Sequence, residues 1–254
     1  MYVYECEDSL EGIFTAIYQT FEDRREHKDT LISINQEQYL FAEYHSVQAD
    51  KEKTLKVMHT LQKRFGENDY GKICLALSSP EADKAQVVYQ TIALGLAQKG
   101  PMQDHLFDML ANDYVNRAFS LSRAAGREEH LLQGFVRFEE LDNGILYAKI
   151  SPKHNVLTFL MPHFSERFPM ENFMIYDAGR DFIGIHPRNK TWYLLSSTLL
   201  ESQFNHLILS EEEVKYQELF RYFCHKIAIK DRENYKLQRN MLPLRFREYM
   251  VEFQ

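Results

Sequence analysis

The spacing of hydrophobic residues changes twice between residues 134 and 197. Over 145–149 hydrophobic and polar residues alternate, which predicts a strand, whereas the run NVLTFLMPHFSER over 155–167 has the 3.6-residue spacing of a helix. The runs NFMIYDAG, RDFIGIHP and TWYLLSST that follow indicate short strands again, and LDNG and AGRD have the composition of hairpin turns. We therefore expect an α+β fold: a mainly antiparallel sheet with a β-hairpin–helix–β-meander core, flanked by a helical region.

The N-terminal part begins with the pattern of a strand that leads into a helix. Tyr2–Cys6 alternates aromatic and aliphatic residues, and Ser9 stands where a helix N-cap is expected. Two apolar runs, LISI and YLFAEYHSV, predict further extended segments, and Gly66 has the position of a helix C-cap. We expect an α/β and helical region over 1–100 and an α+β domain over 101–254, unless both form one compact unit.

A long helix is expected near the C-terminus. Ser210 and Glu213 have the spacing of a capping box, with Ser210 as N-cap. The helix that follows is expected to turn its large hydrophobic side chains inward: Val214, Leu219, Phe220 and Phe223.

Charge is distributed unevenly along the 254 residues. The net charge of −7 argues against a wholly basic nucleic-acid binder. From Arg221 onward, however, eight Lys/Arg stand against four Asp/Glu, or +4, which leaves 22 against 33, or −11, for the residues before it. A basic C-terminal helix is thus expected. No apolar run approaches the length of a membrane span and no basic leader precedes one, so we expect a cytoplasmic protein without a membrane partner.

Two blocks of the sequence together resemble a known bacterial family: SPKHNVLTFLMPHFSERFPMENFMIYDAGRDFIGIH and FCHKIAIKDRENYKLQRNMLPLRFREYM. The family is assigned to DNA metabolism or DNA repair, without a known biochemical activity. Its members are typically encoded beside a radical-SAM protein of DNA modification or repair, and some are fused to a uracil-DNA glycosylase-like domain. The resemblance covers roughly Gln86 to the C-terminus and includes His163-Phe164 with Arg167-Phe168. It implies a DNA-related role and a radical-SAM partner rather than a defined reaction.

Polar residues near the ends of the central elements are the candidate site. His163 and Arg167 are four residues apart on one helix and share a side, and Asp177 and Arg180 flank the next hairpin turn. A histidine, two guanidinium groups and a carboxylate could bind a phosphate and move a proton, with His163 and Asp177 as the catalytic groups. We predict that these side chains come within hydrogen-bond reach of one another. A purely structural ion-pair cluster is the alternative.

Further phosphate contacts are expected outside this group. His154 lies in the loop before the helix, where Asn155 could be the N-cap and the helix N-terminus attracts anions. With the resemblance, His154, Arg167 and Arg180 become phosphate-binding candidates. The basic tail adds Lys230, Arg232, Lys236, Arg239 and Arg245. Cations interleaved with aromatic rings suit a nucleic-acid surface, although the rings could instead belong to the core of a terminal helix.

Several common enzyme classes lack their required motifs. The chain has no Gly-rich phosphate loop, HExxH, GxSxG or metal-binding carboxylate cluster, so neither a metal nor a cofactor is expected. Cys6, Cys74 and Cys224 are too far apart to hold an iron–sulfur cluster. The leading hypothesis is a DNA-metabolism protein that binds nucleic acid or a repair intermediate and acts with the radical-SAM protein. Alternatives are a hydrolase or glycosylase-like enzyme that uses His163, Asp177 and Arg180, or a protein-interaction adaptor with an aromatic surface.

Overall fold

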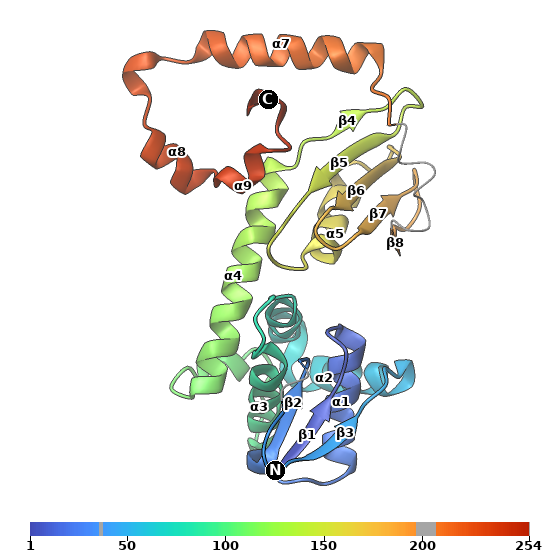
Figure 1. The fold of residues 1–254 in the computed structure, drawn as a ribbon, viewed down its shortest axis with the longest axis vertical. Coiled ribbons are helices and arrows are strands. Elements are labelled where there is room, and N and C mark those ends of the chain that lie inside the picture. Colours follow the sequence, from blue (N-terminus) through green and yellow to red (C-terminus); the bar gives the residue numbers. More distant parts are fainter. Residues whose placement is uncertain (36–37, 197–206, 254) are drawn as a thin grey trace. The chain divides into compact units, whose positions relative to one another are not determined.

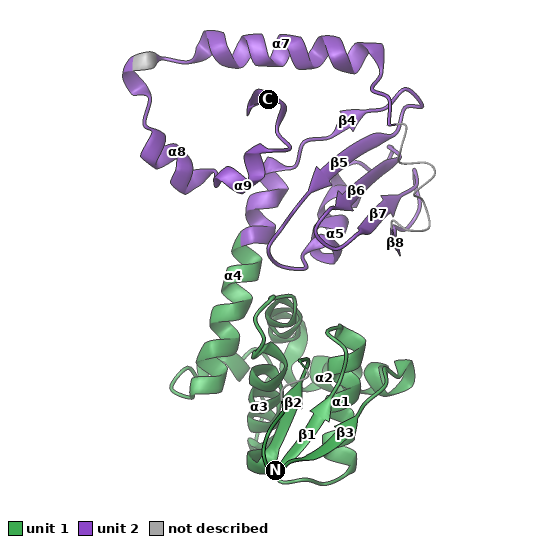
Figure 2. Cartoon of the chain, in the orientation of Figure 1, with its two compact units in different colours: residues 1–127 green, residues 128–254 purple. Residues whose placement is uncertain are grey.

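The computed structural model describes residues 1–35, 38–196 and 207–253, and the chain divides into two compact units (Figure 2). Unit 1 is Met1–Arg127 and unit 2 is Glu128–Gln254; helix α4 (Asp113–Phe135) contributes residues to each. No helix in the described part of the chain combines the length and apolar character that a membrane span requires. Both units contain helices and strands (Figure 1).

Unit 1 contains a three-stranded parallel sheet. Its strands β1 (Tyr2–Glu5), β2 (Thr30–Ser33) and β3 (Glu43–Ser46) are arranged in the order β2-β1-β3. The expected strand and cap at the N-terminus are confirmed, because β1 leads into α1 (Leu10–Glu22) and the Ser9 side chain accepts a hydrogen bond from the Gly12 amide at 2.9 Å.

The other elements of unit 1 are mainly helical. After η1 (His27–Asp29) and the sheet come α2 (Lys51–Leu77), α3 (Lys84–Ala97) and η2 (Leu106–Asp108). Gly66 interrupts α2 with φ 78°, in the left-handed region that glycine adopts without penalty. The expected end of a helix at Gly66 is thus a sharp kink, after which the chain resumes a helical path.

Unit 2 contains a five-stranded mixed sheet. The strands are β4 (Glu139–Glu140), β5 (Leu146–Ile150), β6 (Phe173–Asp177), β7 (Phe182–His186) and β8 (Tyr193–Ser196), in chain order across the sheet. The β4–β5 hairpin and the β6–β7–β8 meander are antiparallel as expected.

The prediction of a mainly antiparallel sheet is nevertheless wrong at its centre. Strands β5 and β6 are parallel, since helix α5 (Leu157–Arg167) carries the chain back across the sheet before β6 begins. Helix α5 covers one face of the sheet and places Leu160, Met161 and Phe164 in its core. It begins after Val156 without a side-chain cap, so the expected Asn155 cap is also wrong.

The C-terminal part of unit 2 forms a series of helices. They are α7 (Glu211–Ile227), η4 (Lys230–Arg232), α8 (Tyr235–Met241), α9 (Leu244–Arg247) and η5 (Val251–Phe253) (Figure 1). Ser210 caps α7 as expected, accepting a hydrogen bond from the Glu213 amide at 3.0 Å. The expectation that Val214, Leu219, Phe220 and Phe223 turn inward is wrong, because all four are exposed.

Candidate functional site

A cleft of about 650 Å³ opens in unit 2 beside the last turns of α4 and the exposed side of α5. We call it the α4–α5 cleft. Its lining combines imidazole, guanidinium, amide and phenyl groups: His130, Gln133, Gly134, Val136, Arg137, Phe138, His163, Phe164, Arg167 and Phe168. The cleft therefore contains all four residues of the His163-Phe164 and Arg167-Phe168 pattern.

The cationic side of the cleft is formed by His163 and Arg167. Their four-residue spacing places both on one side of α5, as predicted. Arg167 is exposed and lies 5.7 Å from the Phe168 ring centroid, and within the described residues it takes part in no ion pair. The His163 ring meets the Phe164 ring nearly edge-on at 5.0 Å. Arg167 thus keeps its hydrogen-bond donors available to a ligand.

A second guanidinium, that of Arg137, is held in place by the protein. It forms an ion pair with Glu252 at 2.8 Å and donates to the Gly134 carbonyl at 3.0 Å. The Glu252 carboxylate neutralises most of the charge that Arg137 brings to the cleft. Arg137 is therefore positioned for a directional hydrogen bond more than for long-range attraction of an anion.

Glu129 lies beside the cleft and responds to its charges. Burial raises the pKa of this carboxyl group, while a hydrogen bond from Gln133 and the charges of His130 and His163 oppose that rise. Two imidazoles thus lie close enough to Glu129 to influence its ionisation.

Phenylalanine rings form the apolar wall of the cleft. Phe138 contacts Phe164 at 5.2 Å and Phe168 at 5.6 Å between centroids, both nearly edge-on. It also contacts Phe173 of the sheet core at 5.6 Å. These edge-to-face contacts fix the rings, so the cleft presents a preformed apolar surface next to cationic groups.

Asp177 and Arg180 lie elsewhere in unit 2. Asp177 ends β6 fully buried, and its carboxylate accepts from the Gly179 amide at 3.0 Å and from Arg180 at 3.1 Å. Burial raises the pKa of Asp177, and the Arg180 charge opposes this rise. No hydrogen bond or ion pair among the described residues joins either residue to His163 or Arg167.

The β5–α5–β6 crossover explains this separation. Because β5 and β6 are parallel, the end of β6 lies beside the end of β5, from which the chain continues into α5. The Ala178 amide accordingly donates to the Ile150 carbonyl at 2.9 Å. His163 and Arg167 are in the last two turns of α5, toward the opposite end of these strands, where β6 begins. The antiparallel arrangement assumed from the sequence would not impose this separation.

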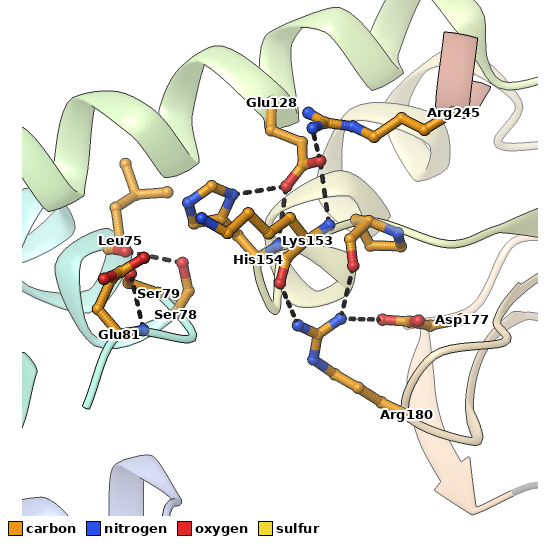
Figure 3. Close-up of polar contacts among 11 residues, drawn as sticks. Leu75, Ser78, Ser79, Glu81, Glu128, Lys153, His154, Asp177, Arg180 and Arg245 are labelled. Atoms are coloured by element: carbon orange, nitrogen blue, oxygen red, sulfur yellow. Dashed lines mark hydrogen bonds and ion pairs between the residues drawn. The ribbon is translucent and has the colours of Figure 1, made fainter. Parts of the chain in front are cut away.

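The loop between β5 and α5 is fixed from two sides (Figure 3). The buried Glu128 accepts from the His154 ring at 2.6 Å, from the His154 amide at 2.8 Å and from the Lys153 amide at 3.1 Å. Arg180 donates to the carbonyls of Pro152 at 3.1 Å and Lys153 at 2.6 Å. His154 is itself buried, so its hydrogen bonds hold the loop in place.

The cations of the tail occupy several environments. Arg245 forms an ion pair with Glu128 at 2.8 Å, while Phe246 packs in the core of unit 2. Arg232, Lys236 and Arg239 are exposed, and no ion pair involves them in the part of the chain that the structure describes. Lys230 begins η4, but its side chain lies outside what the structure describes.

Several residues of these arrangements have no clear signal in the sequence. Glu128 and His130 belong to an ordinary charged run of α4, and the role of each depends on residues more than twenty positions away. Arg137 and Phe138 lie in the short connection between the end of α4 at Phe135 and the first strand of unit 2, which begins at Glu139. Residues 1–35, 38–196 and 207–253 contain no cluster of three or more metal-ligating side chains.

Comparison with known families identifies the C-terminal two thirds of the chain. Residues 82–252 match a domain of unknown function, DUF4130, and no curated protein matches the chain. The matched range includes the α4–α5 cleft and the tail, and it agrees with the extent of the resemblance found from the sequence. Because the match spans more than half of the residues, the chain belongs to the DUF4130 family.

Proposed function

We propose that the protein binds nucleic acid through the α4–α5 cleft and serves DNA metabolism. The observation that carries the proposal is the position of Arg167 and His163 beside the Phe138 and Phe168 rings. Guanidinium and imidazolium groups bind phosphate oxygens, and a neighbouring ring supplies a surface on which a base stacks. A short nucleic-acid segment satisfies both requirements at once.

The geometry favours binding over hydrolysis. The enzyme hypothesis needs His163, Asp177 and Arg180 around one reacting atom, whereas Asp177 and Arg180 are engaged with the β5–α5 loop. We therefore do not propose a catalytic role for this trio. The DNA-related role and the radical-SAM partner rest on the sequence resemblance, and we propose that the protein presents nucleic acid to that partner.

Binding of short single- and double-stranded DNA at increasing salt tests the proposal. The variant Arg167→Ala/His163→Ala removes the imidazole and the guanidinium group that α5 contributes to the cleft. We expect at least a tenfold loss of affinity and a flatter salt dependence, by about 0.7–0.9 in log–log slope for each lost phosphate contact.

A matched control separates the cleft from general charge effects. Arg188→Ala removes another exposed guanidinium group, from the turn between β7 and β8. It should leave affinity and slope close to those of the wild type. Equal losses in both variants, or no DNA affinity at low salt, would refute nucleic-acid binding at the cleft.

A further inference from the structure

Helix α7 carries a continuous stripe of large hydrophobic side chains that the described part of the chain leaves exposed. The α7 stripe consists of Tyr216, Leu219, Phe220, Phe223 and Ile227, which are between 40% and 65% exposed. At about 100° per residue these five occupy roughly 100° of the helix circumference. Such a stripe normally faces a core or a partner helix.

The hydrogen bonds that attach α7 to the rest of unit 2 come from its polar residues. Gln217 is buried and donates to Glu139 at 3.3 Å, and the Glu213 carboxylate accepts from the Glu140 amide at 3.2 Å. Arg221 donates to the Val251 carbonyl at 3.3 Å. Helix α7 is thus attached mainly by its polar side. Tyr216 and Phe220 also line a hollow with Phe138 and Val251, whereas Leu219, Phe223 and Ile227 are exposed outside this hollow.

The charges of α7 suit an antiparallel copy of the same helix. Its first turn contains Glu211, Glu212 and Glu213, and its last turn contains His225 and Lys226. A two-fold axis near Leu219 would place Tyr216 against Phe223 of the second copy and bring Glu212 near Lys226 of the second copy. Because the axis is two-fold, the Tyr216–Phe223 contact and the Glu212–Lys226 contact between the copies each occur twice.

A lipid surface fits these charges less well. The helix carries four Glu against three Lys/Arg, whereas helices that bind anionic membranes have a basic polar side. We propose that the α7 stripe is a homodimer interface, in which α7 of one chain packs antiparallel on α7 of a second copy.

The size of the stripe limits the expected affinity. A helix of 17 residues is about 26 Å long, so one helix pair buries less than the roughly 1,200–2,000 Å² of a standard stable interface. We therefore expect a reversible dimer whose population rises with protein concentration across the micromolar range. The charged residues Glu212 and Lys226 near the two ends of α7 then favour the antiparallel orientation of the helix pair.

Sedimentation equilibrium of the full chain over a range of concentrations tests the proposal. Leu219→Glu/Phe223→Glu should remain folded, since both positions are exposed, and should be monomeric throughout with at least a tenfold weaker association. Leu237→Glu changes an exposed hydrophobic residue of α8, outside the stripe, and is the matched control; it should still dimerise.

A charge exchange tests the antiparallel orientation. Lys226→Glu should weaken the dimer by placing like charges together, and Glu212→Lys/Lys226→Glu should restore association by exchanging the pair. A wild-type chain that remains monomeric at high micromolar concentration would overturn the proposal. Equal effects of the stripe and control variants would overturn it as well.

Discussion

Glu128 and His154 share a 2.6 Å hydrogen bond between Oε2 and Nδ1, although 26 positions separate them in the chain. Both side chains are buried, and Glu128 also holds the Arg245 guanidinium at 2.8 Å. One carboxylate therefore connects α4, the β5–α5 loop and α9. This connection fixes the start of α5, the helix whose later turns form the α4–α5 cleft.

Loss of the Glu128 carboxylate should destabilise unit 2. In Glu128→Ala, the buried amide and ring of His154 and the part-buried amide of Lys153 lose this acceptor, and an unsatisfied buried donor costs about 1–3 kcal/mol. We expect these unsatisfied donors to lower the free energy of unfolding by about 2–3 kcal/mol. Arg245 adds little to this loss, because its partly exposed guanidinium group can turn to solvent. Chemical denaturation measures it. Glu128→Gln retains one acceptor and should lose less; equal losses would contradict this explanation.

The same carboxylate should make the protein sensitive to acid. Burial opposes ionisation of Glu128, but hydrogen bonds from His154 and Lys153 and the Arg245 charge outweigh it, so the pKa lies below its ordinary value of 4.5. A lowered folded-state pKa contributes stability above the unfolded pKa, and this contribution is lost as pH falls through the folded value.

Unfolding free energies measured between pH 7 and pH 3 test this dependence. The stability difference between wild type and Glu128→Gln should be full at pH 7 and should shrink below about pH 4.5, where the unfolded carboxyl group begins to take up a proton. A difference that stays constant down to pH 3 would show that Glu128 does not contribute through its charge.

Close packing of β7 against α5 leads to a third prediction. A Cβ atom at Gly184 would overlap Sδ of Met161 and would lie 2.9 Å from its Cγ. Gly184→Ala should therefore cost about 1–3 kcal/mol of stability. Combined with Met161→Ala, the added methyl group gains space, so the double variant should lose less than the sum of the two single losses.

A glycine with open surroundings provides the control for this overpacking. No atom comes within 4 Å of a Cβ built at Gly134, which is also in unit 2. Gly134→Ala should leave the melting temperature unchanged or raise it, because alanine favours a helix over glycine. Strict additivity of the Gly184 and Met161 variants would indicate that their contact does not limit the packing.

Local sequence signals predicted much of the fold. The cap at Ser9, the cap at Ser210 and the hairpin of β6 and β7 each depend on residues within a few positions of one another. Such signals act before any tertiary contact forms. They are therefore visible in a single sequence.

The errors concern relationships that local signals do not determine. The spacing of α5 predicts a helix but not the parallel return to β6, which separates His163 from Asp177. The periodicity of α7 predicts one apolar side but not what covers it. The Glu128–His154 contact depends on how α4 meets the β5–α5 loop. Each outcome is decided by tertiary packing, where intrinsic preferences are a weak guide.

The attachment of α7 to the sheet leads to the last prediction. Burial raises the pKa of Glu139, and the nearby charge of Glu213 raises it further, while the hydrogen bond from Gln217 opposes both. A carboxyl group with a raised folded-state pKa reduces stability at pH values above that pKa, since its charged form is less favourable in the folded protein. Two carboxylates therefore repel each other where α7 meets β4.

Glu139→Gln should relieve this repulsion and stabilise the protein at pH 7. The amide oxygen remains able to accept from Gln217, and removing one charge of a partly exposed pair is worth a few tenths to about 1 kcal/mol. The gain should decline as pH falls toward 4.5, where the wild-type carboxyl group itself takes up a proton. Denaturant titrations at pH 7 and pH 4.5 measure both values, with Glu166→Gln on the exposed side of α5 as the control. A loss of stability at pH 7, or a gain of equal size for Glu166→Gln, would mean that the Glu139 charge does not oppose the docking of α7.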